Sequence, residues 1–467
     1  MNIVVLNGSP KGQHSITLTY LNFLKTRFPE HQYSIIHISK DILAIEKNRE
    51  RFDEIMRTID IADAVLWLYG VWVLLVPAQM IRFMELIRER KQEHVFTGKY
   101  AASISTSIHY LDHFSEYYIR SESEDLMMKY YDHLSLDMLD MMKADKRENL
   151  CRFFGYFADC TKNIRPLPKH TSPLKISNFR YEPGNPTPKL DTNDKRILIL
   201  SDSPNKGSNL DRMAQRFAET CGRNARLVNL SDLKMKGACT GCMRCGYDNT
   251  CIYNDGFQEF YNENVRNADI IIFAATISGR FLSSTFKTFI DRAYFWTHTP
   301  SLVGKTIGYL IEGSLSQNHN IRQFLEATVT ARQQALFAGI VTDECSDSQA
   351  LDLLIKGFAT SCIQYSSDNY SKGFNFLMHG AHKVFRDYNW SGIRFVWQAD
   401  HRFYKKNGLY DFPQKNRLKN MFLPIAMALC RFPSLRKKIY NNMIKLPAYR
   451  LQKYIDTKLQ KEKSIKT

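Results

Sequence analysis

The chain lacks the marks of a secreted or membrane-spanning protein. Its first residues, MNIVVLNGSPKG, have no basic segment and only a short apolar run, Ile3–Leu6, so they do not form a secretory signal. One uncharged run of 18 residues, Ala64–Ile81, just reaches the length of a membrane span, but Gly70 and Pro77 interrupt it. We therefore expect a cytoplasmic protein in which this run forms a buried strand, a loop and the start of a helix.

Acidic residues are scarce at one end of the chain. The 467 residues are 44% hydrophobic and 24% charged, which excludes a disordered protein and suggests two or three domains. The net charge is +17, yet residues 371–467 hold 21 Lys and Arg against only 5 Asp and Glu. The rest of the chain is nearly neutral. Any partner inferred from charge must therefore meet this C-terminal extension.

The sequence contains a duplication. The segment Asn7–Pro10 follows a short apolar strand, and Ser201–Pro204 follows another one 194 residues later. Further along, Ala62–Val65 and Ala268–Ile271 open equivalent apolar runs at a spacing of 206. The second copy has therefore gained 12 residues between its first and third strands. Four of the ten cysteines lie between those two strands.

Both copies alternate short apolar strands with helical periods, which predicts parallel sheets covered on both faces. Strands are expected near 3–7, 33–38, 64–69 and 100–106, and near 196–200, 225–230, 269–275, 305–311 and 335–341. Helices are expected near 15–27, 50–60, 78–90 and 113–130, and near 208–221, 256–266, 283–296, 317–332 and 347–363. The predicted domains are 1–162 and 195–366, joined by a Pro-rich linker at 163–194 and followed by a basic, mainly helical extension at 371–467.

The first strand of each copy runs into a loop that suits a phosphate. These loops, Ser9–Thr17 and Ser203–Asn209, contain glycine and hydroxyl residues ahead of a predicted helix, whose N-terminus attracts anions. Neither is a dinucleotide fingerprint or a Walker loop. The alternative is that their Ser and Asn residues only cap the helices.

Four cysteines are spaced to bind one metal centre. The pattern is Cys239-x2-Cys242-x2-Cys245-x5-Cys251. In a reducing compartment, clustered cysteines bind metal more often than they form disulfides. Zinc sites usually separate two C-x2-C pairs by a longer loop, so this spacing favours a [4Fe–4S] cluster over zinc or an empty or oxidised loop. The other six cysteines are expected to be buried core thiols.

These motifs resemble the flavodoxin-like NADPH-dependent FMN reductases, and the cysteine spacing is similar to that of the iron-sulfur flavoproteins in that group. The resemblance implies two tandem flavodoxin-like domains of the doubly wound α/β class. It maps the FMN phosphate loop of the first copy onto Ser9, Lys11, Gly12, Ser15 and Thr17, and that of the second copy onto Ser203, Asn205, Ser208 and Asn209. It assigns the cluster to Cys239, Cys242, Cys245 and Cys251.

The two copies differ in the loops expected to face the flavin ring. The first copy has Trp72, an aromatic that can lie against the ring, and His109 and His113 in a later polar loop. The alternative is that these two histidines cap the following helix or bind a metal. The second copy has Ala275–Ser278 and has lost the aromatic. We expect FMN in the first copy and the cluster in the second, with FMN in both copies as the alternative.

The resemblance implies a flavin-dependent oxidoreductase that passes electrons from NAD(P)H or ferredoxin to an unidentified acceptor. It also implies a homo-oligomer, unless the fused copies already bring cluster and flavin together. The alternative is a non-enzymatic redox carrier or scaffold. The C-terminal extension mixes aromatics with bases and contains a short apolar stretch, Phe422–Cys430. It is predicted to cap the sheet domains, to lie on an anionic membrane, or to bind an acidic protein such as ferredoxin, in preference to nucleic acid.

Overall fold

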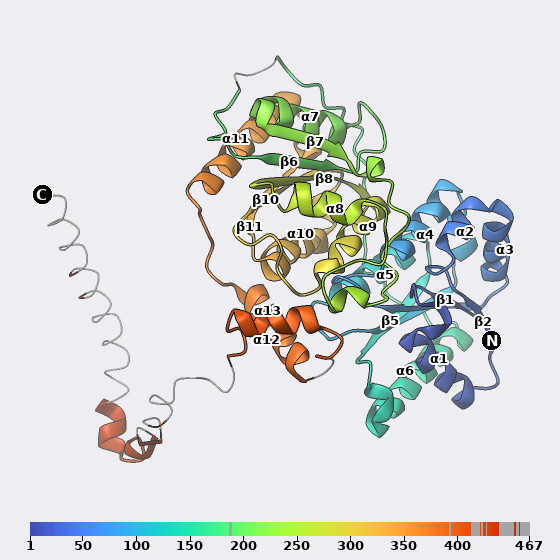
Figure 1. Cartoon of the computed structure of the whole chain (residues 1–467). Helices are drawn as coiled ribbons and strands as arrows, with labels where there is room; N and C mark the ends of the chain where they lie inside the picture. Colours follow the sequence, from blue (N-terminus) through green and yellow to red (C-terminus); the bar gives the residue numbers. More distant parts are fainter. Residues whose placement is uncertain are drawn as a thin grey trace, which may run out of the picture. The chain divides into compact units, whose positions relative to one another are not determined.

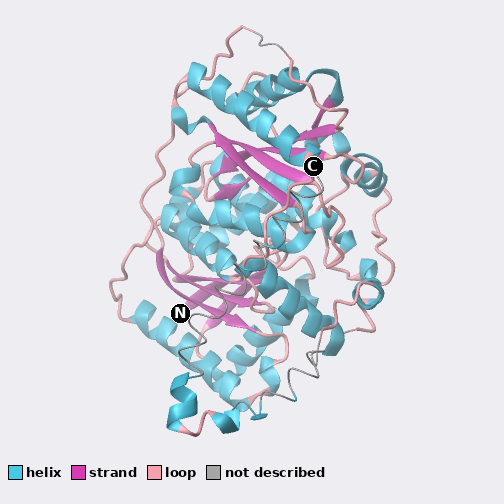
Figure 2. Ribbon diagram, turned by 90° about the vertical axis from the view of Figure 1, so that its left-hand side faces the viewer, coloured by secondary structure: helices cyan, strands magenta, loops and turns pink. Residues whose placement is uncertain are grey.

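The computed structural model describes residues 1–185, 189–391, 394–411, 421, 424–425, 427–438, 453 and 457. Met1–Phe403 forms one compact unit and Tyr404–Thr467 a second (Figure 1). Two parallel sheets lie in the first unit, with helices on both faces of each sheet (Figure 2). The predicted α/β class with two flavodoxin-like sheets is confirmed.

The first sheet has the strand order β2-β1-β3-β4-β5, which is the doubly wound order of flavodoxin. Its strands are β1 (Asn2–Asn7), β2 (Gln32–Ile36), β3 (Ala64–Gly70), β4 (Tyr100–Thr106) and β5 (Lys129–Leu136). Its helices are α1 (Ile16–Arg27), α2 (Ile42–Lys47), α3 (Arg49–Asp60), α4 (Ala78–Glu89), α5 (His113–Asp125) and α6 (Ala144–Lys162). The run 64–81 thus forms a strand, a loop and a helix start, as its interruptions predict.

The second sheet repeats the order as β7-β6-β8-β10-β11, with the short β9 (Phe281–Leu282) antiparallel to β8. Its strands are β6 (Ile197–Ser201), β7 (Ala225–Asn229), β8 (Ile270–Ser278), β10 (Thr306–Glu312) and β11 (Leu336–Thr342). Its helices are α7 (Asn209–Cys221), α8 (Phe257–Phe260), α9 (Ser284–Arg292), α10 (His319–Ala327) and α11 (Ser348–Ser367). A parallel sheet is buried on both faces, which explains the nearly continuous apolar strands.

The two copies share one hydrophobic core. Alternate residues of β3 point to different cores: Leu66 joins a cluster beneath α1 and α6, whereas Trp67 joins a larger cluster. That larger cluster also contains Phe289 and Phe324 of the second copy. The copies therefore pack face to face through apolar side chains, and this contact brings the loops of one copy against the loops of the other.

Reciprocal hydrogen bonds fix this contact. The first N–H of α4, at Ala78, donates to Asp291 Oδ2 at 2.9 Å, and the first N–H of α9, at Ser284, donates to Glu85 Oε1 at 2.7 Å. The two donors, Ala78 and Ser284, are 206 residues apart, and so are the two acceptors, Glu85 and Asp291, which is the spacing of the duplication. Each copy thus supplies the carboxylate that stabilises the positive end of its neighbour's helix.

One predicted element is wrong. The helix expected at 113–130 ends at Asp125, and residues 129–136 form the edge strand β5, followed by the unpredicted α6. β5 is only partly buried and carries Lys129, Asp132 and His133, so it has no continuous apolar run. Of the six cysteines predicted to be core thiols, Cys160, Cys221 and Cys362 are buried, whereas Cys151 and Cys430 are partly exposed and Cys345 is exposed.

Between α6 and β6 the described linker residues contain neither helix nor strand. The linker is nevertheless anchored, because Tyr181 is fully buried and its N–H donates to Asn209 Oδ1 at 2.8 Å. The described part of the extension begins with α12 (Phe376–Ser391) and α13 (Gln398–Lys406). Within the predicted stretch Phe422–Cys430, Phe422, Leu423 and Ala426 lie outside the described residues. None of the described helices is long and apolar enough to cross a lipid bilayer.

Candidate redox site

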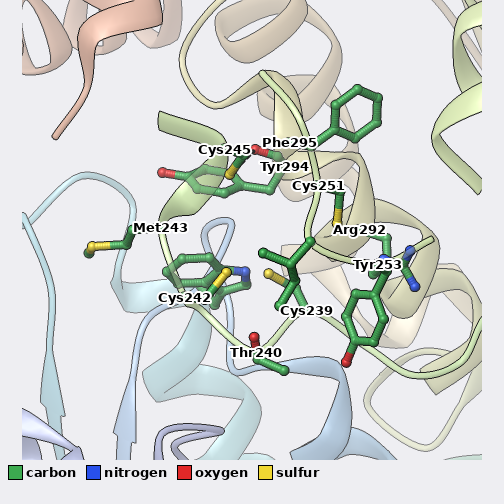
Figure 3. Close-up of a pocket in the computed structure, with 12 residues that line it drawn as sticks. Cys239, Thr240, Cys242, Met243, Cys245, Cys251, Tyr253, Arg292, Tyr294 and Phe295 are labelled. Carbon is green, nitrogen blue, oxygen red and sulfur yellow. Dashed lines mark hydrogen bonds between the residues drawn. The ribbon is translucent and has the colours of Figure 1, made fainter. Parts of the chain in front are cut away.

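The four clustered cysteines line one small cavity in the loop between β7 and α8 (Figure 3). Gly241 and Met243 both have positive φ, at 66° and 62°, so the backbone turns sharply between the first and third cysteine. Gly241 adopts a positive φ without strain because glycine has no Cβ atom. The spacing therefore brings Cys239, Cys242 and Cys245 to one cavity, and Cys251 joins them from the far end of the loop.

The four thiols that line this cavity are candidate ligands for a metal centre. Within the described residues, no group of three or more Cys, His, Asp or Glu side chains is arranged around one ion. Zinc needs four ligands about 2.0–2.3 Å from one point, whereas each thiolate of a cubane binds its own iron and the sulfurs lie further apart. Burial raises the pKa of Cys239 to about 12 and also raises that of Cys245. A bound metal centre would be needed to deprotonate them.

A buried guanidinium with two unbonded nitrogen atoms lies close to this cavity. Arg332 packs its guanidinium carbon 5.7 Å from the ring centre of Tyr294, which lines the cavity. Its Nε and Nη2 atoms are inaccessible to solvent and have no hydrogen-bond partner among the described residues. Burial lowers the pKa of Arg332. A cluster held by four thiolates carries negative charge, so an anionic centre here would compensate the buried guanidinium.

The first copy reaches the same cavity. Trp72, in the loop after β3, lines it, and its ring centre lies 4.8 Å from that of Tyr294. A Cβ atom on Gly241 would lie 3.3 Å from Lys11 Cε and 3.8 Å from the Trp72 indole. The structure thus brings two predicted flavin residues of the first copy, Lys11 and Trp72, against the cysteine loop of the second.

A buried ion pair holds the Trp72 loop in place. Lys287 and Asp291 are fully buried and pair with each other, and Lys287 Nζ also donates to the Trp72 carbonyl at 2.9 Å. Gln79 Nε2 donates to the Cys239 carbonyl at 2.9 Å. Removing one partner of a buried pair typically costs about 3–5 kcal/mol. These contacts hold the aromatic loop of the first copy against the cysteine loop of the second.

The phosphate-loop candidates of the first copy gather at the start of α1. Ser9, Gly12, Ser15 and Thr17 are buried, and Lys11 is half-buried. Ser15 is the N-cap of α1, but its Oγ contacts Thr17 Oγ1 at 2.5 Å and does not accept a bond from the helix backbone. The first N–H groups of a helix have no intrahelical partner. This helix end therefore keeps donors for an anion.

The corresponding loop of the second copy is occupied by its own side chains. Ser208 Oγ accepts from the Asp211 N–H at 3.1 Å, and the Gly207 N–H donates to the Asp211 carboxylate at 2.7 Å. Ser203 Oγ donates to the Asn205 carbonyl at 3.0 Å. Asn209 Nδ2 donates to Asp343 at 2.8 Å. An acidic side chain and a formed cap thus stand where a phosphate would bind.

His109 lies in the loop after β4 with a strained φ of 58°, and its side chain is half-exposed. Its Nδ1 contacts Asp112 Oδ2 at 3.2 Å, and that carboxylate also accepts from Ser107 at 2.8 Å and Ser135 at 2.6 Å. These hydrogen bonds, against the effect of burial, lower the pKa of Asp112. His113 does not join this group, because it begins α5.

Two polar residues beside this loop, His133 and Ser135, are missed by sequence reasoning because they lie on the edge strand β5. Ser135 Oγ donates to Asp112, and the partly buried His133 has its Nδ1 2.6 Å from Ser103 Oγ and its Nε2 3.1 Å from Ser105 Oγ. Burial lowers the pKa of His133 to about 4. Serines at alternate positions 103, 105 and 107 are the signal that could have revealed a polar sheet face.

The first part of the C-terminal extension covers both loops. A Cβ atom on Gly246 would lie 2.7 Å from the Trp397 ring, so the indole packs directly on the cysteine loop. The buried Asp400 accepts from the His298 N–H at 3.1 Å and Thr299 Oγ1 at 3.0 Å. Near the first copy's polar loop, Tyr110 donates to the Leu377 carbonyl at 2.6 Å. Residues up to Phe403 therefore belong to the body of the molecule.

Comparison with known sequences agrees with this geometry. The pattern of one family, described as NADPH-dependent FMN reductase, matches residues 1–111 and 195–340, more than half of the chain. The chain belongs to this family. The FMN reductase family is one of oxidoreductases, and both matched stretches contain a phosphate-loop candidate. The resemblance predicted from the sequence is confirmed.

Individual relatives cover only parts of the chain. An iron-sulfur flavoprotein of Archaeoglobus fulgidus is 32% identical over 120 residues, which are 25% of this chain and 53% of that protein. The chain thus spans about half the length of this curated relative. Among solved structures, the flavoenzyme FerB, an NAD(P)H:(acceptor) oxidoreductase from Paracoccus denitrificans, is 17% identical with a TM-score of 0.27, covering 35% of this chain and 97% of its own. General stress protein 14 of Treponema denticola, in complex with FMN, is 7% identical with a TM-score of 0.27, covering 35% and 99%.

Proposed function

We propose that this chain is an FMN-dependent oxidoreductase in which FMN binds the first copy and a [4Fe–4S] cluster binds the cysteine loop of the second. The observation that carries the proposal is the single cavity lined by all four cysteines and by Trp72 of the other copy. Homologous oligomers would need two chains to make such a junction. Here the duplication supplies both sides of it.

Each residue has a definite part in this arrangement. Ser9, Ser15 and the N-terminus of α1 would hold the phosphate, with Lys11 adding a positive charge. Trp72 would lie against the flavin ring. Bound FMN would supply the capacity to exchange both hydride and single electrons, and a cluster held by the four cysteines would supply one-electron transfer. The Lys287–Asp291 pair would keep the Trp72 loop against the cysteine loop, and Trp397 would exclude water from its outer side.

Anaerobic metal analysis tests the cluster. The purified chain should contain about four irons and four sulfides. Cys242→Ala should remove most of the iron and leave FMN bound, because the flavin residues lie in the first copy. Cys345→Ala is the matched control, since this cysteine is also exposed but lies outside the loop. Zinc in place of iron, or equal iron in both variants, would contradict the cluster assignment.

A second candidate is a non-enzymatic redox carrier or scaffold docked through its basic end. Residues 412–467 hold 14 basic and 2 acidic side chains, which suits an acidic protein such as ferredoxin or an anionic membrane surface. NADPH should bleach the flavin of an enzyme, whereas only dithionite or reduced ferredoxin should bleach a carrier.

Truncation tests the docking role. Removing 412–467 should leave FMN and iron unchanged, because both sites lie within Met1–Phe403. It should abolish binding to vesicles containing anionic lipid, and for the full chain that binding should weaken with salt because exposed charges are screened within about 8 Å at physiological ionic strength. Undiminished vesicle binding by the truncated chain would contradict membrane docking.

A further inference from the structure

Two N–H groups at the cysteine cavity have no acceptor among the described residues. Trp72 of the first copy and Arg292 of the second both line this cavity. The Trp72 Nε1 and Arg292 Nε atoms are inaccessible to solvent, and neither has a hydrogen-bond partner in the described part of the chain. A buried polar group without a partner costs about 1–3 kcal/mol. Each copy therefore presents an unused donor to the cavity that the four thiols line.

Arg292 is fixed by its other two nitrogen atoms. The residue is 1% exposed, and its Nη1 and Nη2 donate to the Asp255 carboxylate at 2.9 and 2.8 Å. Nη1 also donates to the Gly237 carbonyl at 2.9 Å, and Asp255 accepts from the Lys236 N–H at 2.9 Å. The guanidinium thus joins the two ends of the cysteine loop. Against the effect of burial, its bonds with Asp255 and the nearby Cys251 raise the pKa of Arg292, so the donor is charged.

The duplication shows that this cation is not a requirement of the fold. At the spacing of 206 residues, Arg292 corresponds to Leu86 of the first copy, and Lys287 corresponds to Ile81. Leu86 and Ile81 are buried apolar side chains on α4. The equivalent helix α9 therefore carries two buried cations only in the copy that contains the four cysteines. This difference links Arg292 to the cysteine loop.

Trp72 is held at the cavity by a strained turn. Val73 and Leu74, which follow it, have positive φ values of 47° and 66°. The position equivalent to Val73 in the second copy is Gly279, which adopts a φ of 69° without this strain. A non-glycine residue in such a conformation costs about 1–3 kcal/mol and persists only where surrounding contacts hold it. The bond from Lys287 Nζ to the Trp72 carbonyl is one such contact.

The sulfur atoms of a metal centre would accept both N–H groups. A cluster bound by four thiolates carries negative charge, and each electron that it takes up adds to that charge. Hydrogen bonds to the sulfur atoms are one of the factors that set the reduction potential of an iron–sulfur cluster. Because a donor binds the more negative state more tightly, it favours the reduced cluster and raises the potential.

We propose that Trp72 and Arg292, one from each copy, donate hydrogen bonds to sulfur atoms of the metal centre and raise its reduction potential. This inference rests on the proposed function, because it requires the cluster. Reduction adds one electron to the centre, which dithionite supplies in the experiment below, and no covalent bond of the chain forms or breaks. A residue of the first copy thus adjusts the cluster of the second.

Anaerobic titration of the iron-loaded full chain with dithionite, followed by the EPR signal of the reduced cluster, tests the Trp72 donor. Trp72→Phe keeps an aromatic ring and removes the N–H. We expect it to shift the reduction equilibrium about tenfold toward the oxidised cluster, which is about 59 mV for one electron. Trp67→Phe is the matched control, because the Trp67 N–H is also buried and unbonded but does not line the cavity. It should leave the potential unchanged.

Arg292→Lys tests the second donor, because it keeps the positive charge and removes Nε. It should shift the equilibrium several-fold in the same direction. A purely structural role would lower the iron content without moving the potential of the cluster that remains. Equal potentials in the parent, Trp72→Phe and Arg292→Lys chains, or equal shifts in Trp72→Phe and Trp67→Phe, would overturn this inference alone. A parent chain without iron would overturn it together with the proposed function.

Discussion

The two copies share a fold and differ in what their first loops can bind. In the first copy, the N-cap Ser15 leaves the start of α1 without a side-chain cap, and Lys11 lies beside it. In the second copy, Ser208 caps α7 and Asp211 places a carboxylate in its first turn. The same backbone thus offers a phosphate site once and closes it once. The proposed function accordingly assigns the flavin to the copy with the open helix end and the cluster to the copy that contains the four cysteines.

Charge placed in each phosphate loop should give the largest difference between the copies. Ser15→Asp puts a carboxylate where the FMN phosphate is expected. Like charges about 4 Å apart repel by about 4 kcal/mol at an effective dielectric constant of about 20. FMN affinity should therefore fall at least about 100-fold, as measured by flavin fluorescence titration.

Ser208→Asp is the matched change in the second copy. It should leave FMN binding nearly unchanged, because Asp211 already occupies that helix end. Equal loss of FMN from both variants would show that both copies bind it. Loss from Ser208→Asp alone would reverse the assignment.

The pH dependence of stability should also differ between the copies. Burial raises the pKa of Asp202 to about 7, so between about pH 4 and 7 the native chain keeps a proton that the unfolded chain has lost. The contribution of Asp202 to the free energy of unfolding therefore falls as pH rises through this range, by up to about 1.4 kcal/mol per pH unit. The equivalent residue in the first copy is Gly8, where a Cβ atom would lie 2.5 Å from Met80 Sδ.

His133 of the first copy should act in the opposite direction. Its pKa is lowered to about 4, so its contribution is present above about pH 6.5 and is lost as pH falls toward 4. Between pH 5 and 7, Asp202→Asn should make the denaturation midpoint rise more with pH than in the parent chain, and His133→Gln should make it rise less. Parallel midpoint curves for all three chains would contradict the raised pKa of Asp202 and the lowered pKa of His133.

The sequence predicts those features that depend on neighbouring residues. Apolar runs such as Ile270–Phe273 predict the central strands, and the close spacing of Cys239 and Cys251 predicts that they meet. What it misses depends on distant contacts. The edge strand β5 is polar because one side of it is exposed, so its register with β4 is visible only in the fold.

The same reason hides the supporting residues of the candidate site. Arg332 lies 81 residues beyond Cys251, and Asp400 reaches the segment at His298 from the C-terminal extension. Neither belongs to a local motif. The packing of Trp397 on Gly246 likewise joins two segments that no periodicity relates. Sequence reasoning therefore predicts the candidate ligands better than the side chains that would position them.

The smallest expected effect concerns the two N-cap serines. Ser208→Ala removes a formed cap and should destabilise the FMN-free chain by about 1 kcal/mol. Ser15→Ala removes no cap, so the FMN-free chain should lose less stability, but its FMN affinity should fall several-fold because a phosphate donor is gone. Denaturant titration without FMN and flavin titration of the folded chain measure the two effects separately. If Ser15→Ala costs as much stability as Ser208→Ala and leaves FMN affinity unchanged, the two loops are equivalent caps and the difference between the copies lies elsewhere.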